Sequence, residues 1–433
     1  MKSVAKFAAL CGFIFSSLTA MAQFDDRDIP QYRYRDFRGI NQFEALESDI
    51  IYDGFKVRLG GSFAVQMQAL SHSNGSVADT LALIGNNFNL PTANLDVDVA
   101  LADGMRMHMR TYLSARRHPE SWVKGGYIQV DNLNWIKDGL FENIMDFTTI
   151  KMGLMEINYG DAHFRRTDNA RAIYNPFVGN LIMDAFNTEA GAEIYFNPGD
   201  FLIMAGVTNG KLNQSVATDT VTPYTPAFLG KIGWDKQMNN DLRVRLTGSF
   251  YTSAEGKTNY LYFGDRGGSR YYLVMEPQGA SPVSSSRSGR WSPSFINEVT
   301  AVMINPFVKF KGLEFFGAYE TASGKISGEN DTRSYTQLYG ELVYRLGSRE
   351  QYYIGGRYNS VSGQLTNFVP NTDAQEISIS RFAIAAGWYM TPNVMIKAEY
   401  VNQDYNDFSE TGANSIFYDG NFNGAVLEAT ISF

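Results

Sequence analysis

Apolar and polar residues alternate one by one along positions 55–69, FKVRLGGSFAVQMQA. The odd positions from Val57 to Ala69 are apolar wherever they are not glycine, and most even positions are polar. Because successive side chains of a β-strand point to opposite faces, this pattern predicts a strand with one apolar face along its whole length. The alternation also lasts longer than an average strand of a soluble protein.

The same alternation crosses a turn in the segment 94–110, NLDVDVALADGMRMHMR. Odd positions stay apolar on both sides of the turn, which requires a loop with an odd number of residues. A three-residue loop with Gly104 in the left-handed conformation meets that requirement. The register that follows pairs Asp98 with His108 and Asp96 with Arg110 on the polar face.

A polar face with opposite charges across from each other, backed by a long apolar face, is typical of a barrel with lipid outside and water inside. The pattern recurs at 242–251 and at the C-terminus, 424–433. Reading such segments along the chain predicts sixteen strands. They lie near 55–70, 89–102, 105–117, 121–131, 147–156, 186–196, 201–209, 226–235, 241–252, 296–310, 312–322, 334–346, 351–361, 377–391, 394–403 and 422–433.

The connections between these strands alternate between short and long, which the strand count did not assume. Short turns on one rim, long loops on the other and an even number of strands are the plan of an outer-membrane barrel. We therefore predict an all-β, transmembrane, antiparallel barrel with short periplasmic turns and long extracellular loops. Sixteen strands enclose a lumen wide enough for water, and an extra hairpin around 271–276 would raise the count to eighteen.

The N-terminus has the three parts of a secretory signal: Lys2 and Lys6, an apolar run at 7–18, and small residues at 20–22. We expect a signal peptide at 1–22, an N-terminal periplasmic segment at 23–54 and the barrel at 55–433. Removing two lysines changes the formal net charge from −8 to −10, so nucleic acid is an unfavourable partner. The single cysteine, Cys11, lies inside the signal.

Five segments of the chain resemble outer-membrane porins of the Bacteroidota type. They are RGINQFE (38–44), KMGLMEINYGDAHFRRTDNARAIYNPFVGN (151–180), INPFVKFKGLEFFGAYE (304–320), YYIGGRYNSVSG (352–363) and the terminal Phe433. The chain resembles the phosphate-selective porin O and P family more distantly. The resemblance implies passive transport of small hydrophilic solutes or ions across the outer membrane of a Gram-negative bacterium, a homotrimer with lipid around it, and recognition of Phe433 by the barrel-assembly machinery.

The long connection at 157–185 carries the charges that could constrict such a pore. Rings of fixed charge at a narrow passage select ions because a passing ion loses part of its hydration there. The basic candidates are Arg165, Arg166 and Arg171 with Lys151 at the loop's base, and the acidic ones are Asp161, Asp168 and Asp184. Two interpretations stay open: a loop folded into the lumen, leaning toward anions, or arginines that are exposed to solvent or pair with the loop's own aspartates.

The strand pattern places further charges on inward positions of the wall. The candidate pore-lining residues there are Arg58, Arg106, Arg110, Asp96, Asp98, Arg243 and Arg245. The four histidines show no metal-ligand spacing, no serine is placed for a catalytic triad, and no cofactor motif occurs. We therefore expect no enzyme, metal or cofactor. The alternative to a porin is a non-conducting structural or assembly component of the outer membrane, closed by its loops, with 253–295 as its interaction surface.

Overall fold

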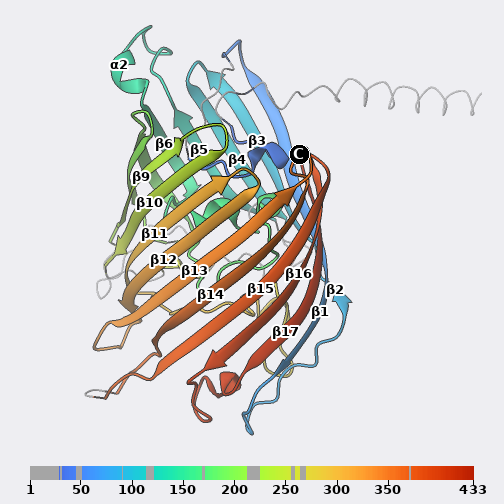
Figure 1. Cartoon of the computed structure of the whole chain (residues 1–433). Coiled ribbons are helices and arrows are strands. Elements are labelled where there is room, and N and C mark those ends of the chain that lie inside the picture. Colours follow the sequence, from blue (N-terminus) through green and yellow to red (C-terminus); the bar gives the residue numbers. More distant parts are fainter. Residues whose placement is uncertain are drawn as a thin grey trace, which may run out of the picture.

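The chain closes into a single antiparallel β-barrel, drawn in Figure 1. The structure is a computed structural model that describes residue 29 and residues 32–44, 51–89, 91–113, 121–167, 171–211, 225–254, 259–263, 270–369 and 372–433. The expected signal peptide lies outside the described residues. The barrel strands are β1 (Lys56–Ser73), β3 (Thr92–Ala102), β4 (Met105–Leu113), β5 (Ser121–Val130), β6 (Thr148–Glu156), β7 (Thr188–Phe196), β8 (Phe201–Thr208), β9 (Ala227–Gln237), β10 (Leu242–Ser253), β11 (Glu298–Phe310), β12 (Leu313–Lys325), β13 (Arg333–Leu346), β14 (Tyr352–Gln364), β15 (Glu376–Thr391), β16 (Val394–Asn406) and β17 (Asn421–Ser432).

Each of these strands pairs with its neighbours in the chain, and β17 closes the ring on β1. Every predicted strand therefore has its counterpart, and the sixteen-stranded barrel is confirmed. One further strand, β2 (Asn87–Phe88), adds two residues of pairing beside β1. The extra hairpin considered around 271–276 does not form among the described residues of that connection: Val274 and Met275 lie in turns, and Pro277 forms an isolated bridge with Leu81.

The register of the β3–β4 hairpin is the one that the sequence predicts. Asp98 lies opposite His108, and Asp96 lies opposite Arg110. Gly104 has φ +67°, and a register shift at the end of β3 accommodates the extra residue of the turn. Gly104 is required because L-residues with a side chain rarely adopt this conformation.

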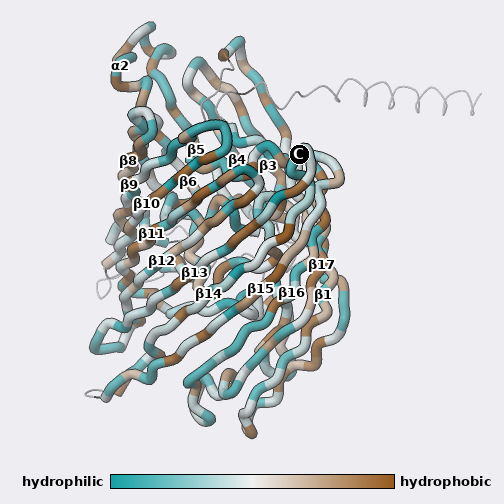
Figure 2. The backbone as a smooth tube through the Cα atoms, viewed as in Figure 1, coloured by the Kyte–Doolittle hydropathy of each residue, from teal (hydrophilic) through white to brown (hydrophobic). Residues whose placement is uncertain are grey.

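Burial alternates along the strands with the predicted parity. In β14, Tyr352, Ile354 and Tyr358 are about half exposed, while Tyr353 and Arg357 are buried. Figure 2 shows hydrophobic and hydrophilic residues interspersed along the strands, and the apolar side chains of the strands include many that are exposed. This apolar outer face is what a barrel presents to lipid, so the chain has the form of a transmembrane β-barrel.

Helical structure is confined to a few short turns among the described residues. The α-helix α2 (Glu142–Met145) projects at the rim that carries the short turns, which we call the short-turn rim (Figure 1). None of the helices in the described part of the chain has the length and apolar character needed to cross a membrane.

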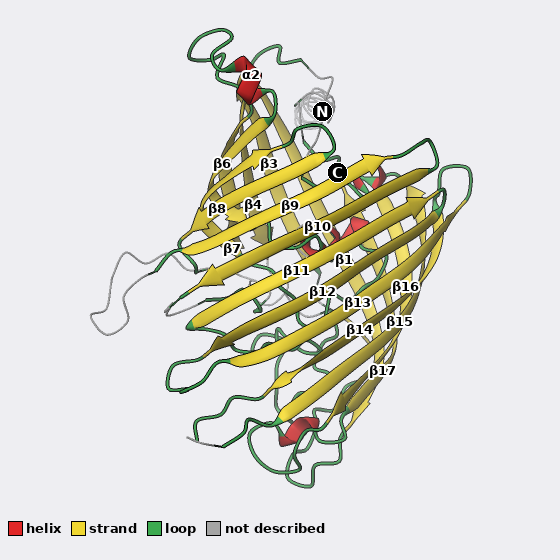
Figure 3. Ribbon diagram, turned by 60° about the vertical axis from the view of Figure 1, so that its left-hand side comes forward, coloured by secondary structure: helices red, strands yellow, loops and turns green. Residues whose placement is uncertain are grey.

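The interior of the ring holds three segments of the chain. They are the N-terminal segment (32–44), the first inner loop (157–187, between β6 and β7) and the second inner loop (254–297, between β10 and β11). Figure 3 shows loops and short helices running inside the ring of strands. The 3-10 helices η1 (Phe37–Gly39), η2 (Ala162–Arg165) and η3 (Ala172–Tyr174) belong to the first two of these segments.

A charge on the lipid face should weaken the barrel. We expect Ile384→Lys, on the outer face of β15, to destabilise the folded barrel by about 2–4 kcal/mol, because the ammonium group must leave water. Urea unfolding in lipid vesicles measures this effect. Ser378→Lys, on the same face but near the end of β15, should lower the free energy of unfolding far less. Equal losses for the two variants would contradict a lipid-facing wall.

Candidate functional site

The first inner loop lies against the inner wall of the barrel, where strand side chains bind its backbone. The amide of Ile182 donates to Oδ1 of Asn359 at 2.7 Å, and the amide of Val178 donates to a Glu399 carboxylate oxygen at 2.8 Å. Near its start, the amide of Gly160 donates to Oγ of Ser249 at 2.9 Å. These contacts reach β14, β16 and β10, so the loop fills the lumen beneath that part of the wall.

Arg165 and Arg166 are buried inside the barrel, and both have carboxylate partners. Nη2 of Arg165 lies 2.7 Å from Oε1 of Glu341 on β13. Nη2 of Arg166 lies 3.0 Å from Oδ2 of Asp184 in the same loop. Pairing with the loop's own aspartates therefore holds for Arg166 and not for Arg165. Neither arginine is exposed, and neither lines the cavity described below, because the loop packs both side chains against buried carboxylates.

Arg171 takes a different position, at the base of the loop and beside open space. Its guanidinium contacts the carboxylate of Glu156, at the end of β6, and the carbonyl of His163. His163 also contacts Glu156 and is buried. Asp168, its predicted neighbour, lies outside the described residues.

The second inner loop packs on the first and on β16 and β17 of the wall. Tyr271 donates its hydroxyl to Glu399 at 2.5 Å, and Arg270 contacts the carboxylate of Glu428 on β17. The amide of Trp291 donates to the carbonyl of Ile182 at 2.8 Å. We predicted an interaction surface on this connection, but these residues face the barrel interior instead.

The N-terminal segment also enters the barrel, although we expected 23–54 to lie in the periplasm. Arg35 contacts Asp96 and Asp98 on β3, and Asn41 donates to Glu314 on β12 at 2.7 Å. Phe43 packs edge-on against Phe164 and Phe307. These three carboxylates already pair with arginines of the wall, and the N-terminal segment adds a further cation and an amide donor to them.

Glu44 ends the described N-terminal segment in a buried ionic cluster. Its carboxylate lies 2.8 Å from Nζ of Lys231 and 2.6 Å from Nη2 of Arg245. Asp161 of the first inner loop binds the same two cations at 3.0 Å and 2.9 Å. Burial acts to raise the pKa of Glu44, but Arg245 and Lys231 outweigh it and lower the pKa to about 2.

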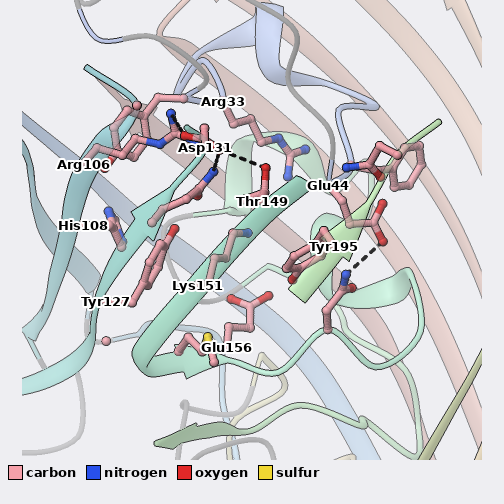
Figure 4. A pocket seen from close by; sticks show the side chains of 18 of the residues that line it. Arg33, Glu44, Arg106, His108, Tyr127, Asp131, Thr149, Lys151, Glu156 and Tyr195 are labelled. Carbon is pink, nitrogen blue, oxygen red and sulfur yellow. Dashed lines mark hydrogen bonds and ion pairs between the residues drawn. The ribbon is translucent and has the colours of Figure 1, made fainter. Parts of the chain in front are cut away.

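A cavity of about 640 Å³ remains between these segments and one side of the wall. It begins at the short-turn rim, near Asp103 and Asn197, and follows the inner faces of β4–β7 as far as Lys124 and Thr188. Figure 4 shows side chains from the wall and the N-terminal segment converging on it. Its volume is within the usual range for small-molecule sites.

Charged groups of both signs line this cavity. The cations are Arg33, Arg35, Arg106, Arg110, Lys124, Lys151 and Arg171, and the carboxylates are Glu44, Asp103, Asp131, Asp146 and Glu156. Several are already paired, since Arg106 lies 2.7 Å from Asp131 and Arg110 lies 2.8 Å from Asp96. The lining therefore leans toward positive charge.

Four of the predicted site residues line the cavity, and nine lie away from it. Those in the cavity are Lys151, Arg106, Arg110 and Arg171. The others are held in buried or partly buried ion pairs at its margins: Arg165, Arg166, Asp161, Asp184, Arg58, Asp96, Asp98, Arg243 and Arg245. A residue on an inward position thus often serves packing instead of lining a passage.

Three lining residues that the sequence reading missed are Tyr127, Tyr195 and Arg33. Tyr127 shares the inward parity of Gln129 on β5, so the alternation could have revealed it. No comparable sequence pattern indicated Arg33, because the N-terminal segment has no strand periodicity. Within the described residues, no three histidine, cysteine or acidic side chains gather as metal ligands would.

Comparison with known proteins gives matches at the level of structure. No family model and no curated protein matches the sequence. A loop L8 deletion mutant of OmpT, an outer membrane protein of Vibrio cholerae, is 11% identical with a TM-score of 0.51, covering 88% of this chain and 100% of that chain. The anion-selective porin from Comamonas acidovorans is 8% identical with a TM-score of 0.54, again covering 88% and 100%.

The outer membrane channel DcaP of Acinetobacter baumannii is 12% identical with a TM-score of 0.51, covering 88% of this chain and 98% of that chain. The chain has the porin fold. At these identities the similarity shows the fold alone. The function of this porin-like barrel depends on the residues that line its own lumen.

Removing the charge of Glu44 should loosen the N-terminal segment. We expect Glu44→Gln to destabilise docking of the segment by about 3–5 kcal/mol, because Lys231 and Arg245 lose a buried carboxylate. Trypsin should then cut faster after Arg33 or Arg38. Glu298→Gln, which removes a partly exposed pair with Lys325, is the matched control and should leave the cleavage rate unchanged. Unchanged cleavage in Glu44→Gln would contradict the role of Glu44 in holding the N-terminal segment in the barrel.

The same cluster predicts a pH dependence with a defined sign. The folded-state pKa of Glu44 is about 2, below its ordinary 4.5, so its stabilising effect is complete above pH 4.5 and is lost as the pH falls toward 2. Hydrogen exchange of residues 32–44, corrected for intrinsic rates, should therefore accelerate on acidification. Glu44→Gln should show a smaller acceleration. An equal response in the two proteins would exclude Glu44 as the titrating group.

Proposed function

We propose that this protein is a passive channel for small hydrophilic solutes or ions in the outer membrane of a Gram-negative bacterium. The observation that carries the proposal is the polar cavity that enters a lipid-facing barrel at the short-turn rim and follows β4–β7. A charged, water-accessible lumen inside an apolar wall is what passive diffusion of polar solutes requires.

A preference for anions follows from the lining of the cavity. Its cations outnumber its carboxylates, and a positive lining raises the local concentration of anions. Lys151 on β6 and Arg171 in the first inner loop both line the cavity, so they act on a solute inside it. Arg165 and Arg166 are neutralised by partners and contribute little to this field.

Assembly as a homotrimer and recognition of Phe433 by the barrel-assembly machinery are parts of the same proposal. Phe433 exchanges backbone hydrogen bonds with Gly61 at the closing seam of the barrel, and its side chain is more than half exposed. A terminal aromatic side chain is therefore available at the short-turn rim. The apolar outer wall offers lipid or a second subunit a surface to cover.

A second candidate is a structural barrel that does not conduct. Three segments occupy the lumen, and buried ion pairs hold all of them to the wall. If the cavity ended inside the protein, the barrel would act through its rims, for example through the exposed turn around α2. Lys151, which has no ion-pair partner among the described residues, favours the channel, because a sealed interior gains nothing from an unpaired cation.

Single-channel recording in planar bilayers separates the two candidates. We expect discrete conductance steps from the purified protein, and larger steps after deletion of residues 32–44, because that segment lines the cavity at the short-turn rim. Deleting 135–140, in the exposed turn outside the lumen, should leave the step size unchanged. An absence of steps in all three proteins would overturn the channel and favour the structural role.

A further inference from the structure

Lys151 is a cation on the cavity wall that lacks a partner of opposite charge. It projects from the inner face of β6, where the rings of Tyr195 and Tyr127 lie 4.7 Å and 5.8 Å from Nζ. Among the described residues, none forms a hydrogen bond or ion pair with it. The buried lysines of this lumen are satisfied differently: Lys231 binds Glu44, and Lys397 binds Glu428 at 2.9 Å.

The carboxylates nearest to Lys151 are occupied by other donors. Glu193 lies opposite Lys151 in the β6–β7 register, yet it accepts hydrogen bonds from the amide of Asn158 at 3.0 Å and from Tyr195 at 2.5 Å. Asp131 accepts from Gln129 and Thr149 and pairs with Arg106. The ammonium group is therefore left for something that enters the cavity.

One more donor lies beside Lys151. The hydroxyl of Tyr127, whose ring centroid is 5.8 Å from Nζ of Lys151, has no hydrogen-bond partner within the described part of the chain. Arg33 also lines the cavity and adds positive charge, but its guanidinium is held against the ring of Tyr174, 3.7 Å from the centroid, and donates to the carbonyls of Gly39 and Phe164. Figure 4 shows Lys151 between Tyr127 and Tyr195.

We propose that Lys151 and Tyr127 bind the carboxylate of a small organic monoanion whose apolar body packs on the rings of Tyr127 and Tyr195. The inference rests on the proposed channel function, since the site lies on the proposed path. Cationic and hydroxyl donors suit a carboxylate. Neighbouring carboxylates such as Asp131 and Glu156 disfavour a second negative charge, and aromatic walls favour a solute with apolar surface over a bare inorganic ion.

Benzoate titrations of the detergent-solubilised, full-length mature barrel test the site without requiring conduction. Saturation-transfer NMR should show saturable benzoate binding, weakened at least about tenfold in Lys151→Met and about threefold in Tyr127→Phe. Lys236→Met, which removes a lysine paired with Asp200 outside the cavity, is the matched control and should bind like the parent. Benzamide, a neutral analogue, should bind far more weakly than benzoate.

The outcomes distinguish this site from the channel itself. Equal benzoate binding by Lys151→Met and the parent, or no saturable binding at all, would overturn the site even if conductance steps are present. Inorganic phosphate that displaces benzoate at equal concentration would overturn the organic ligand class. Conversely, benzoate binding that depends on Lys151, in a protein without conductance steps, would support the site and overturn the channel.

Discussion

Pairing of buried charges is the constraint on which this barrel depends. Its wall presents many carboxylates and cations to an interior that is largely filled with protein, and a buried charge without a partner is costly. Glu399 accepts from Val178 of the first inner loop and from Tyr271 of the second. Glu428 binds both Lys397 and Arg270. The wall thus holds the inner segments because they complete its hydrogen bonds.

The inner segments pack against one side of the wall more than the other, and this asymmetry leaves the cavity open. The first inner loop binds to β10, β11, β13, β14 and β16. The cavity remains along β4–β7, where the lining cations outnumber the lining carboxylates. The cluster of Glu44, Asp161, Lys231 and Arg245 marks the boundary, since it joins the N-terminal segment and the first inner loop to the wall. These ion pairs therefore lie at the limit between the filled part of the lumen and the cavity.

The sequence predicted the wall well and the interior poorly, for a physical reason. Alternation with period two and turn residues such as Gly104 are local signals, so strands and the pairing of Asp98 with His108 followed directly. The partner of Arg165 is Glu341, on a strand far along the chain, and no periodicity links the two. The N-terminal segment likewise has no pattern that indicates its entry into the lumen. Lys151 was predicted, but its aromatic neighbours depend on the relative placement of three strands.

Protein fills one side of the lumen, and water reaches the other. Modification of single cysteines by a small, membrane-impermeant thiol reagent tests this difference in a Cys11→Ser background, because Cys11 is the chain's one cysteine. Thr149→Cys lies in the cavity, whereas Ser249→Cys lies beneath the first inner loop. The account predicts rapid modification at position 149 and protection at position 249. Equally rapid modification at both positions would contradict it.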